Sequence, residues 1–214
     1  SEMRRWSMEL AKNHPVTHPR TKVSVYNDVC RQALINSGVV LPDQVVVTGC
    51  ARLDISHRIR TIRNPQKLPR LRVVYYMIQQ NAGGFAVASE LFFDLAKKVS
   101  AIMIDLANQY PDVDFLFKTK TGVTLSQLET LPEKLPLNIQ LSQEGIGHEL
   151  LRGAKIVVGF NTTALYEAIA SGCTVISPRR MVSQVGSFRE SCHTYDGCCE
   201  EPRSEESFRE VFDK

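Results

Sequence analysis

The sequence lacks the long apolar segments that would place its 214 residues in a membrane or on a secretory route. No apolar run approaches the roughly 20 residues that a membrane-spanning helix needs. The opening residues, SEMRRWSMELAKNHP, contain no apolar core of the signal-peptide type. From these absences we expect a cytoplasmic protein.

The sequence also lacks a charge excess of either sign and any metal-type cysteine spacing. Its net charge is +3, and aromatic residues do not interleave with the basic ones, which argues against a nucleic-acid partner. Its six cysteines form no C-x-x-C pair and no zinc-finger pattern with histidine. We therefore expect reduced thiols and neither a metal nor another cofactor. A metal cluster within residues 192–199, where CH and CC pairs occur, is the alternative.

What the sequence does contain, from residue 71 onward, is a regular alternation of apolar strands and amphipathic helices. The expected strands are 71–77, 115–117, 138–141, 156–158 and 175–177, and the expected helices are 89–110, 147–152, 164–171 and 204–214. Such alternation predicts an α/β protein with a doubly wound, mainly parallel, Rossmann-like sheet.

The residues before 71 follow a different pattern. Residues 22–38 carry apolar side chains at roughly helical spacing and end in Gly38, so they predict a helix. A strand is expected at 45–47. Residues 55–70 are basic and interrupted by proline, which is typical of a linker. The sequence therefore predicts two domains, 1–70 and 71–214.

The segment 155–178 is the most informative one. It predicts a strand, a polar turn, a helix that ends before Gly172, and a second strand. The turn consists of Asn161, Thr162 and Thr163, which are residue types that cap a helix. Free N–H groups and the helix dipole would make this turn a seat for a phosphate group. The alternative is an ordinary strand-helix unit whose helix start is merely capped.

Other candidate ligand residues follow the remaining strands, because ligands of doubly wound sheets bind beyond the carboxyl ends of the strands. Gly83 and Gly84 could let the backbone approach a ligand, or could form a plain turn. Lys118 and Lys120 could neutralise phosphate charge, or could be solvated strand ends. The cationic character of this edge favours an anionic ligand.

Two motifs make the pattern more specific. Residues 147–178, GHELLRGAKIVVGFNTTALYEAIASGCTVISP, resemble the donor-binding half of GT-B glycosyltransferases, in particular bacterial enzymes of surface-carbohydrate assembly. Residues 45–54, VVVTGCARLD, resemble the V-T-G-x-x-R-x-D step near the crossover between the two halves of that fold. The resemblance covers about residues 22–180.

The resemblance implies roles for individual residues. Asn161, Thr162 and Thr163 would bind the donor phosphates, and Glu167 would accept a hydrogen bond from a ribose or sugar hydroxyl. His148 would approach the base or the phosphate. Lys118 stands where relatives often have a basic residue, but their basic-x-His or His-Pro form is replaced here by Lys118-Thr119-Lys120. The glycines at 83 and 84 would line the nucleotide-sugar site.

The resemblance also implies a function. The chain would be a glycosyltransferase, or its donor-binding half, acting in surface polysaccharide or lipopolysaccharide assembly. Its partners would be a nucleotide-sugar and a glycan or lipid-linked acceptor, with peripheral contact at the inner membrane surface. Residues 1–70 would be a remnant of the N-terminal half plus the crossover, and residues 71–214 would bind the donor.

The catalytic base of this fold usually comes from the N-terminal half, so no catalytic residue is assigned. We expect the isolated chain, as part of a larger enzyme, to catalyse little by itself. Two alternatives stay open. One is a nucleotide-sugar 2-epimerase of the same architecture, which would need suitably placed carboxylates. The other is a non-catalytic binding module whose partner surface is the basic segment 58–70.

Overall fold

The computed structural model describes residues 20–62, 70–78, 89–120, 128–145, 147–181 and 197–213. The chain divides into two compact units, Ser1–Asp54 and Ile55–Lys214. The sequence suggested two domains divided after residue 70, and that division stays a prediction. The assignment of the first unit as a remnant of an N-terminal half stays a prediction.

The first unit is a small strand-helix-strand motif. Strand β1 (Val23–Val25) pairs in parallel with β2 (Val45–Val47), and helix α2 (Asp28–Ser37) connects them. Short 3-10 turns at Pro42–Gln44 and Ala51–Leu53 flank β2. The Asn27 side chain accepts a hydrogen bond from the Cys30 N–H at 2.9 Å, so it begins the helix. Gly38 ends the helix in a left-handed conformation, with φ of 73°.

Two predictions for the N-terminal part are wrong in detail. The helix predicted over 22–38 begins only at Asp28, because Val23 to Val25 form a strand and Asn27 caps the helix behind them. The linker predicted over 55–70 begins with a helix, α3 (Asp54–Ile62). Ser56 and Ile59, one turn apart, are buried on one face of α3 among its basic residues. Residues 63–69 lie outside the described part of the chain.

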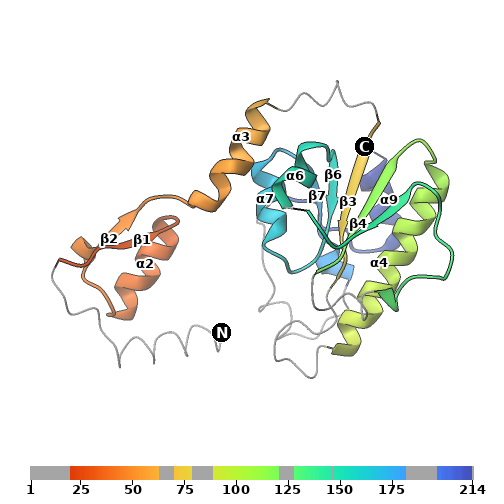
Figure 1. The fold of residues 1–214 in the computed structure, drawn as a ribbon. Helices are drawn as coiled ribbons and strands as arrows, with labels where there is room; N and C mark the ends of the chain where they lie inside the picture. Colours follow the sequence, from red (N-terminus) through yellow and green to blue (C-terminus); the bar gives the residue numbers. More distant parts are fainter. Residues whose placement is uncertain are drawn as a thin grey trace. The chain divides into compact units, whose positions relative to one another are not determined.

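The second unit contains the predicted parallel sheet. Its five strands are β3 (Arg72–Tyr76), β4 (Asp114–Lys118), β5 (Ile139–Ser142), β6 (Ile156–Val158) and β7 (Thr174–Ile176). All of them pair in parallel, in the order β5-β4-β3-β6-β7 (Figure 1). The doubly wound α/β fold is thus confirmed. The chain builds outward from β3 in one direction and, from β6, in the other, so the topological switch lies between these two strands.

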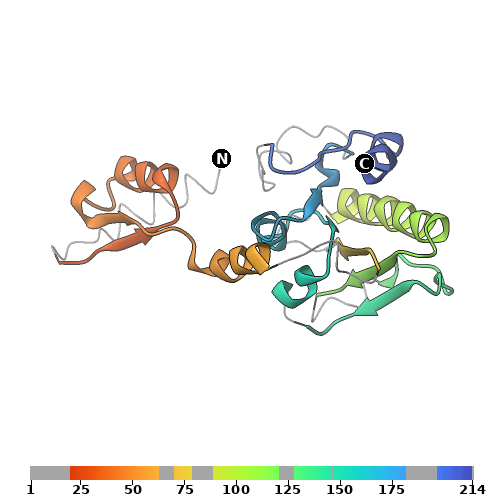
Figure 2. The ribbon, with the colours of Figure 1, turned by 90° about the horizontal axis from the view of Figure 1, so that it is seen from above.

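Helices cover both faces of the sheet (Figure 2). Helices α4 (Ser89–Gln109) and α9 (Glu205–Phe212) pack on one face, where Phe115 and Phe212 stack with ring centroids 6.0 Å apart. Helices α6 (Gly147–Arg152) and α7 (Ala164–Ala170) pack on the other, through Leu151 and Leu165. Among the described residues, no helix combines the length and apolar character that a membrane crossing requires.

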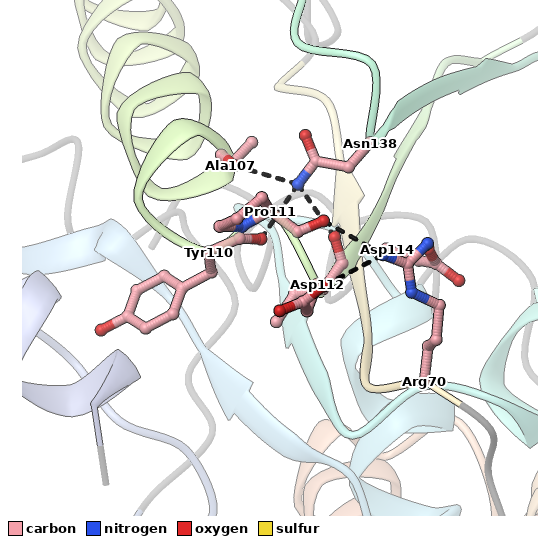
Figure 3. A network of polar contacts seen from close by, with 8 residues as sticks. Arg70, Ala107, Tyr110, Pro111, Asp112, Asp114 and Asn138 are labelled. Carbon is pink, nitrogen blue, oxygen red and sulfur yellow. Dashed lines mark hydrogen bonds and ion pairs between the residues drawn. The ribbon is translucent and has the colours of Figure 1, made fainter.

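Asn138, just before β5, fastens the amino-terminal edge of the sheet (Figure 3). Its side-chain amide donates to the carbonyl oxygens of Ala107, Tyr110 and Val113 at 2.9, 3.0 and 2.9 Å. The Ala107 carbonyl needs this donor because residue 111, which would normally supply the helical N–H, is proline. The end of α4 is thereby joined to the start of β4 and β5.

Candidate functional site at the carboxyl ends of the strands

The carboxyl edge of the sheet presents a polar row on the face covered by α6 and α7. The β5-β4-β3 register aligns Ser142, Lys118 and Tyr76, and its continuation across β6 and β7 adds Gly159 and Ser177. The preceding row on the same face is apolar in β4, β3, β6 and β7. Its residues Leu116, Val74, Val157 and Val175 lie in the core beneath α6 and α7. Side chains alternate between the faces of a strand, so this row is the last one before the connecting loops.

Gly159 lets the chain turn closely over the switch between β3 and β6. A Cβ placed on it would lie 3.1 Å from the Leu165 Cδ2 and 3.3 Å from the Tyr76 Cβ. Its N–H donates to the Ile176 carbonyl at 3.2 Å, so the β6-β7 pairing continues up to this residue. A side chain here would separate α7 from the sheet, and the turn that follows would be displaced with it.

The predicted capping turn forms, and Thr162 contributes a capping hydrogen bond to it. The Thr162 hydroxyl accepts the Ala164 N–H at 3.3 Å, and the Thr162 carbonyl accepts the Leu165 N–H at 3.2 Å. Thr163 makes no side-chain cap. Asn161 has a φ of 48°, a left-handed conformation that asparagine tolerates better than most residues. The three N–H groups at the start of α7 are thus engaged within the turn, since that of Tyr166 bonds to Thr163.

Glu167 reaches from α7 to the start of α6. Its Oε2 lies 3.2 Å from the position that a Cβ on Gly147 would occupy, and the Tyr76 hydroxyl lies 3.7 Å from the same point. Three elements, β3, α6 and α7, therefore bring a carboxylate and a phenol together beside the switch. Burial, followed by the negative charge of Glu167, raises the pKa of Tyr76 well above its ordinary value.

Tyr76 is a residue that the sequence analysis missed. Its hydroxyl is fully covered and makes no hydrogen bond with the part of the chain that the structure describes. The sequence feature that could have revealed Tyr76 is its position as the last residue of the predicted strand. A hydroxyl-bearing side chain there lies at the carboxyl end of the strand, where doubly wound sheets bind ligands.

Lys118 and Lys120 have different environments. The Lys118 ammonium donates to the carbonyls of Thr119 and Gln143 at 2.8 and 2.6 Å, so it joins the loops after β4 and β5. Partial burial lowers the pKa of Lys118. Lys120 is exposed. The two lysines therefore contribute positive potential in different ways, one from a fixed position and one from the surface.

The remaining predicted residues are partly accounted for. His148 is half-buried in the first turn of α6, next to Gly147. Gly83 and Gly84 lie outside the described residues. Within the described ranges no group of three or more His, Cys, Asp or Glu side chains could hold a metal ion, and residues 192–196 of the suggested cysteine cluster fall outside those ranges.

The loop after β7 carries an ion-pair cluster. Glu201 lies 3.6 Å from the Arg179 guanidinium and 2.8 Å from that of Arg180. The backbone carbonyl of the neighbouring Glu200 accepts the Ser177 N–H at 2.8 Å, and Glu200 extends the sheet by one bridge to Ile176. Burial, with the nearby Glu201, raises the pKa of the Cys199 thiol to about 12.

Comparison with solved structures places this geometry among known folds. UDP-GlcNAc 2-epimerase from Methanocaldococcus jannaschii, in complex with UDP-GlcNAc and UDP, aligns with 90% of this chain and 53% of its own, at 13% identity and a TM-score of 0.56. The epimerase from Neisseria meningitidis bound to UDP-GlcNAc aligns with 87% of this chain and 50% of its own, at 15% identity and a TM-score of 0.54. The chain has the Rossmann-like α/β fold of one half of a GT-B protein.

The chain spans about half the length of the two epimerases that it matches. The beta Kdo 2,4 transferase KpsC of Thermosulfurimonas dismutans also aligns, over 61% of this chain and 46% of its own, at 15% identity. Its TM-score of 0.36 is too low to add to the argument. No protein-family model and no curated protein sequence matches this chain. The resemblance to GT-B proteins is therefore confirmed at the level of the fold.

Proposed function

We propose that this chain is the nucleotide-sugar-binding half of a GT-B glycosyltransferase. The observation that carries the proposal is the convergence of Tyr76, Gly147 and Glu167 beside the switch between β3 and β6. Ligands of doubly wound sheets bind at this switch, beyond the carboxyl ends of the strands. A carboxylate held there is suited to accept hydrogen bonds from ribose or sugar hydroxyls.

In this proposal the diphosphate lies over the turn 161–163. Because the first N–H groups of α7 are engaged within the turn, the phosphates would bind chiefly through the side chains of Asn161, Thr162 and Thr163. Lys118 and Lys120 would add positive potential, and His148 with Gly83 and Gly84 would complete the nucleotide-sugar site. Fixed positive groups stabilise the charge that develops on a leaving phosphate, so transfer from this donor needs no metal.

The wider setting follows from the same proposal. The acceptor would be a glycan or lipid-linked saccharide used in surface polysaccharide assembly. The enzyme would act in the cytoplasm, with peripheral contact at the inner membrane surface. The catalytic base would lie outside the binding residues named here, in the other half of the enzyme.

Calorimetric titration of the chain with UDP, GDP and CMP tests the proposal. At least one nucleotide should bind, and Glu167→Gln should weaken it about tenfold or more, the contribution of a hydrogen bond to a charged group. The matched control is Glu133→Gln, an exposed glutamate in the segment before β5, which should bind like the parent. Failure of all three nucleotides to bind the parent chain would refute the proposal.

A 2-epimerase is the second candidate, and the two epimerase structures described above favour it, with TM-scores of 0.54 and 0.56. Both proteins in those structures are UDP-GlcNAc 2-epimerases with bound UDP-GlcNAc. Incubation of the protein with UDP-GlcNAc alone separates the two activities. An epimerase converts the sugar without an acceptor, whereas a transferase releases UDP only when an acceptor hydroxyl is supplied.

A further inference from the structure

The Tyr76 hydroxyl is a buried polar group for which the described residues offer no hydrogen-bond partner. It belongs to the last residue of β3, behind the buried Val73, Val74 and Tyr75, and it makes no hydrogen bond with the described part of the chain. Buried hydroxyl groups nearly always have partners, because an unsatisfied one loses its bonds to water without replacement. Such a group next to a ligand site needs an explanation other than packing.

A carboxylate that shares the space beside Gly147 indicates what this hydroxyl could bond to. Beside Gly147, the point where a Cβ would lie has two side-chain atoms within 4 Å, the Glu167 Oε2 at 3.2 Å and the Tyr76 hydroxyl at 3.7 Å. Because both atoms lie near this one point, rotation of the Glu167 side chain can bring its carboxylate toward the phenol. The phenol can donate and the carboxylate can only accept, so the pair is chemically matched.

Two roles for Tyr76 can be separated by its burial. A residue that contacts the ligand directly needs an accessible atom, and the Tyr76 hydroxyl has almost no accessible surface. Its influence on a ligand must therefore pass through a neighbour. Glu167 is that neighbour, since it shares the space beside Gly147 and extends from the helix that follows the proposed phosphate turn.

We propose that Tyr76 is a positioning residue that donates a hydrogen bond to Glu167 when ligand binds, fixing the carboxylate to accept a ribose or sugar hydroxyl. The inference rests on the proposed nucleotide-sugar site and deepens it. One carboxylate oxygen accepts from Tyr76 and the other from the ligand. Gly147 contributes to this arrangement, because its lack of a side chain leaves space for the Glu167 carboxylate to rotate.

The first test is Tyr76→Phe, measured in the full chain with UDP as the probe. UDP should bind about tenfold more weakly, because one hydrogen bond to a charged group is lost. The melting temperature of the free protein should not fall, since the removed hydroxyl has no hydrogen-bond partner among the residues that the structure describes. Unchanged UDP affinity in Tyr76→Phe, with binding retained by the parent, would overturn this inference and leave the proposed function intact.

Two further readouts separate positioning from a general structural role. In the Glu167→Gln background, Tyr76→Phe should have little further effect on UDP binding, so the two substitutions should be strongly non-additive. UDP binding should also produce a tyrosine signal in the ultraviolet difference spectrum that Tyr76→Phe abolishes. Additive effects, or an unchanged spectrum, would contradict a hydrogen bond formed on binding.

A second variant, Gly147→Ala, keeps the test independent of Tyr76. Alanine suits a helix better than glycine, so the free protein should be at least as stable as the parent. Its methyl group would lie 3.2 Å from the Glu167 Oε2, where it obstructs the rotation, and UDP binding should weaken about tenfold. Parent-like UDP affinity in this variant would contradict the inference. If the parent chain itself does not bind UDP, both this inference and its UDP-based site are overturned.

Discussion

Replacing Asn138 by alanine should destabilise the second unit. The Asn138 amide carries two hydrogens and serves three carbonyl oxygens, those of Ala107, Tyr110 and Val113 (Figure 3). Tyr110 has another donor, the Val113 N–H at 3.1 Å. The Ala107 carbonyl has no helical donor, because residue 111 is proline and has no N–H. After the substitution, only water could donate a hydrogen bond to this carbonyl.

The size of the effect follows from these contacts. A hydrogen bond of this kind contributes roughly 0.5–1.5 kcal/mol to stability, and the substitution removes both donor hydrogens of the Asn138 amide. Because the site is only partly buried, water replaces part of the loss, and we expect about 2 kcal/mol. For a unit of this size that corresponds to a melting temperature lower by roughly 4–8 °C.

Chemical denaturation and calorimetry of Asn138→Ala measure this loss. The matched control is Gln140→Ala, on the same edge strand with an exposed side chain, which should leave the melting temperature within about 1 °C. A loss below roughly 0.5 kcal/mol for Asn138→Ala would refute the view that this amide joins α4 to the sheet.

Two further predictions concern the carboxyl edge. Gly159→Ala should lower the free energy of unfolding by roughly 1–3 kcal/mol, because its methyl group would press on Leu165 and Tyr76 at 3.1 and 3.3 Å, and thermal denaturation measures this. In iodoacetamide labelling at pH 8, exposed Cys198 should react while Cys199 stays unmodified, and peptide mass spectrometry distinguishes the two. The reason is that the raised pKa of the Cys199 thiol, about 12, leaves almost no thiolate until the pH approaches that value. Equal labelling of the two cysteines would contradict the burial of Cys199.

The sequence predicted the central part of the fold well, for a physical reason. Strands that are buried on both faces are continuous apolar runs, and those at 115–117 and 156–158 could be recognised without knowledge of their neighbours. Helix ends were equally readable where a cap decides them. Ser204 accepts the Ser207 N–H at the start of α9, and Gly172 adopts a φ of 75° behind α7, both as their residue types predict.

Features that depend on distant partners could not be predicted in the same way. Strand β1 has only three residues and lies within an apolar pattern that also fits a helix, so its pairing with β2 decides its conformation. The order of the strands arises from crossovers of the whole chain. The proposed role of Tyr76 could not be recognised from the sequence, because it depends on Glu167. That residue is distant in the sequence and close to Tyr76 only in the folded protein.

The two edges of the sheet differ in how they satisfy their polar groups, and this difference favours the carboxyl edge as the ligand site. At the amino-terminal edge, Asn138 provides donors for three carbonyls, and Arg70 donates to the Pro111 carbonyl at 3.1 Å. At the carboxyl edge, the buried hydroxyls of Tyr76 and Ser177 find no partner within the described residues. Each such group costs about 1–3 kcal/mol, a burden that a fold of marginal stability rarely keeps without a functional reason. The proposed binding of a ligand at this edge would supply that reason for Tyr76, through Glu167.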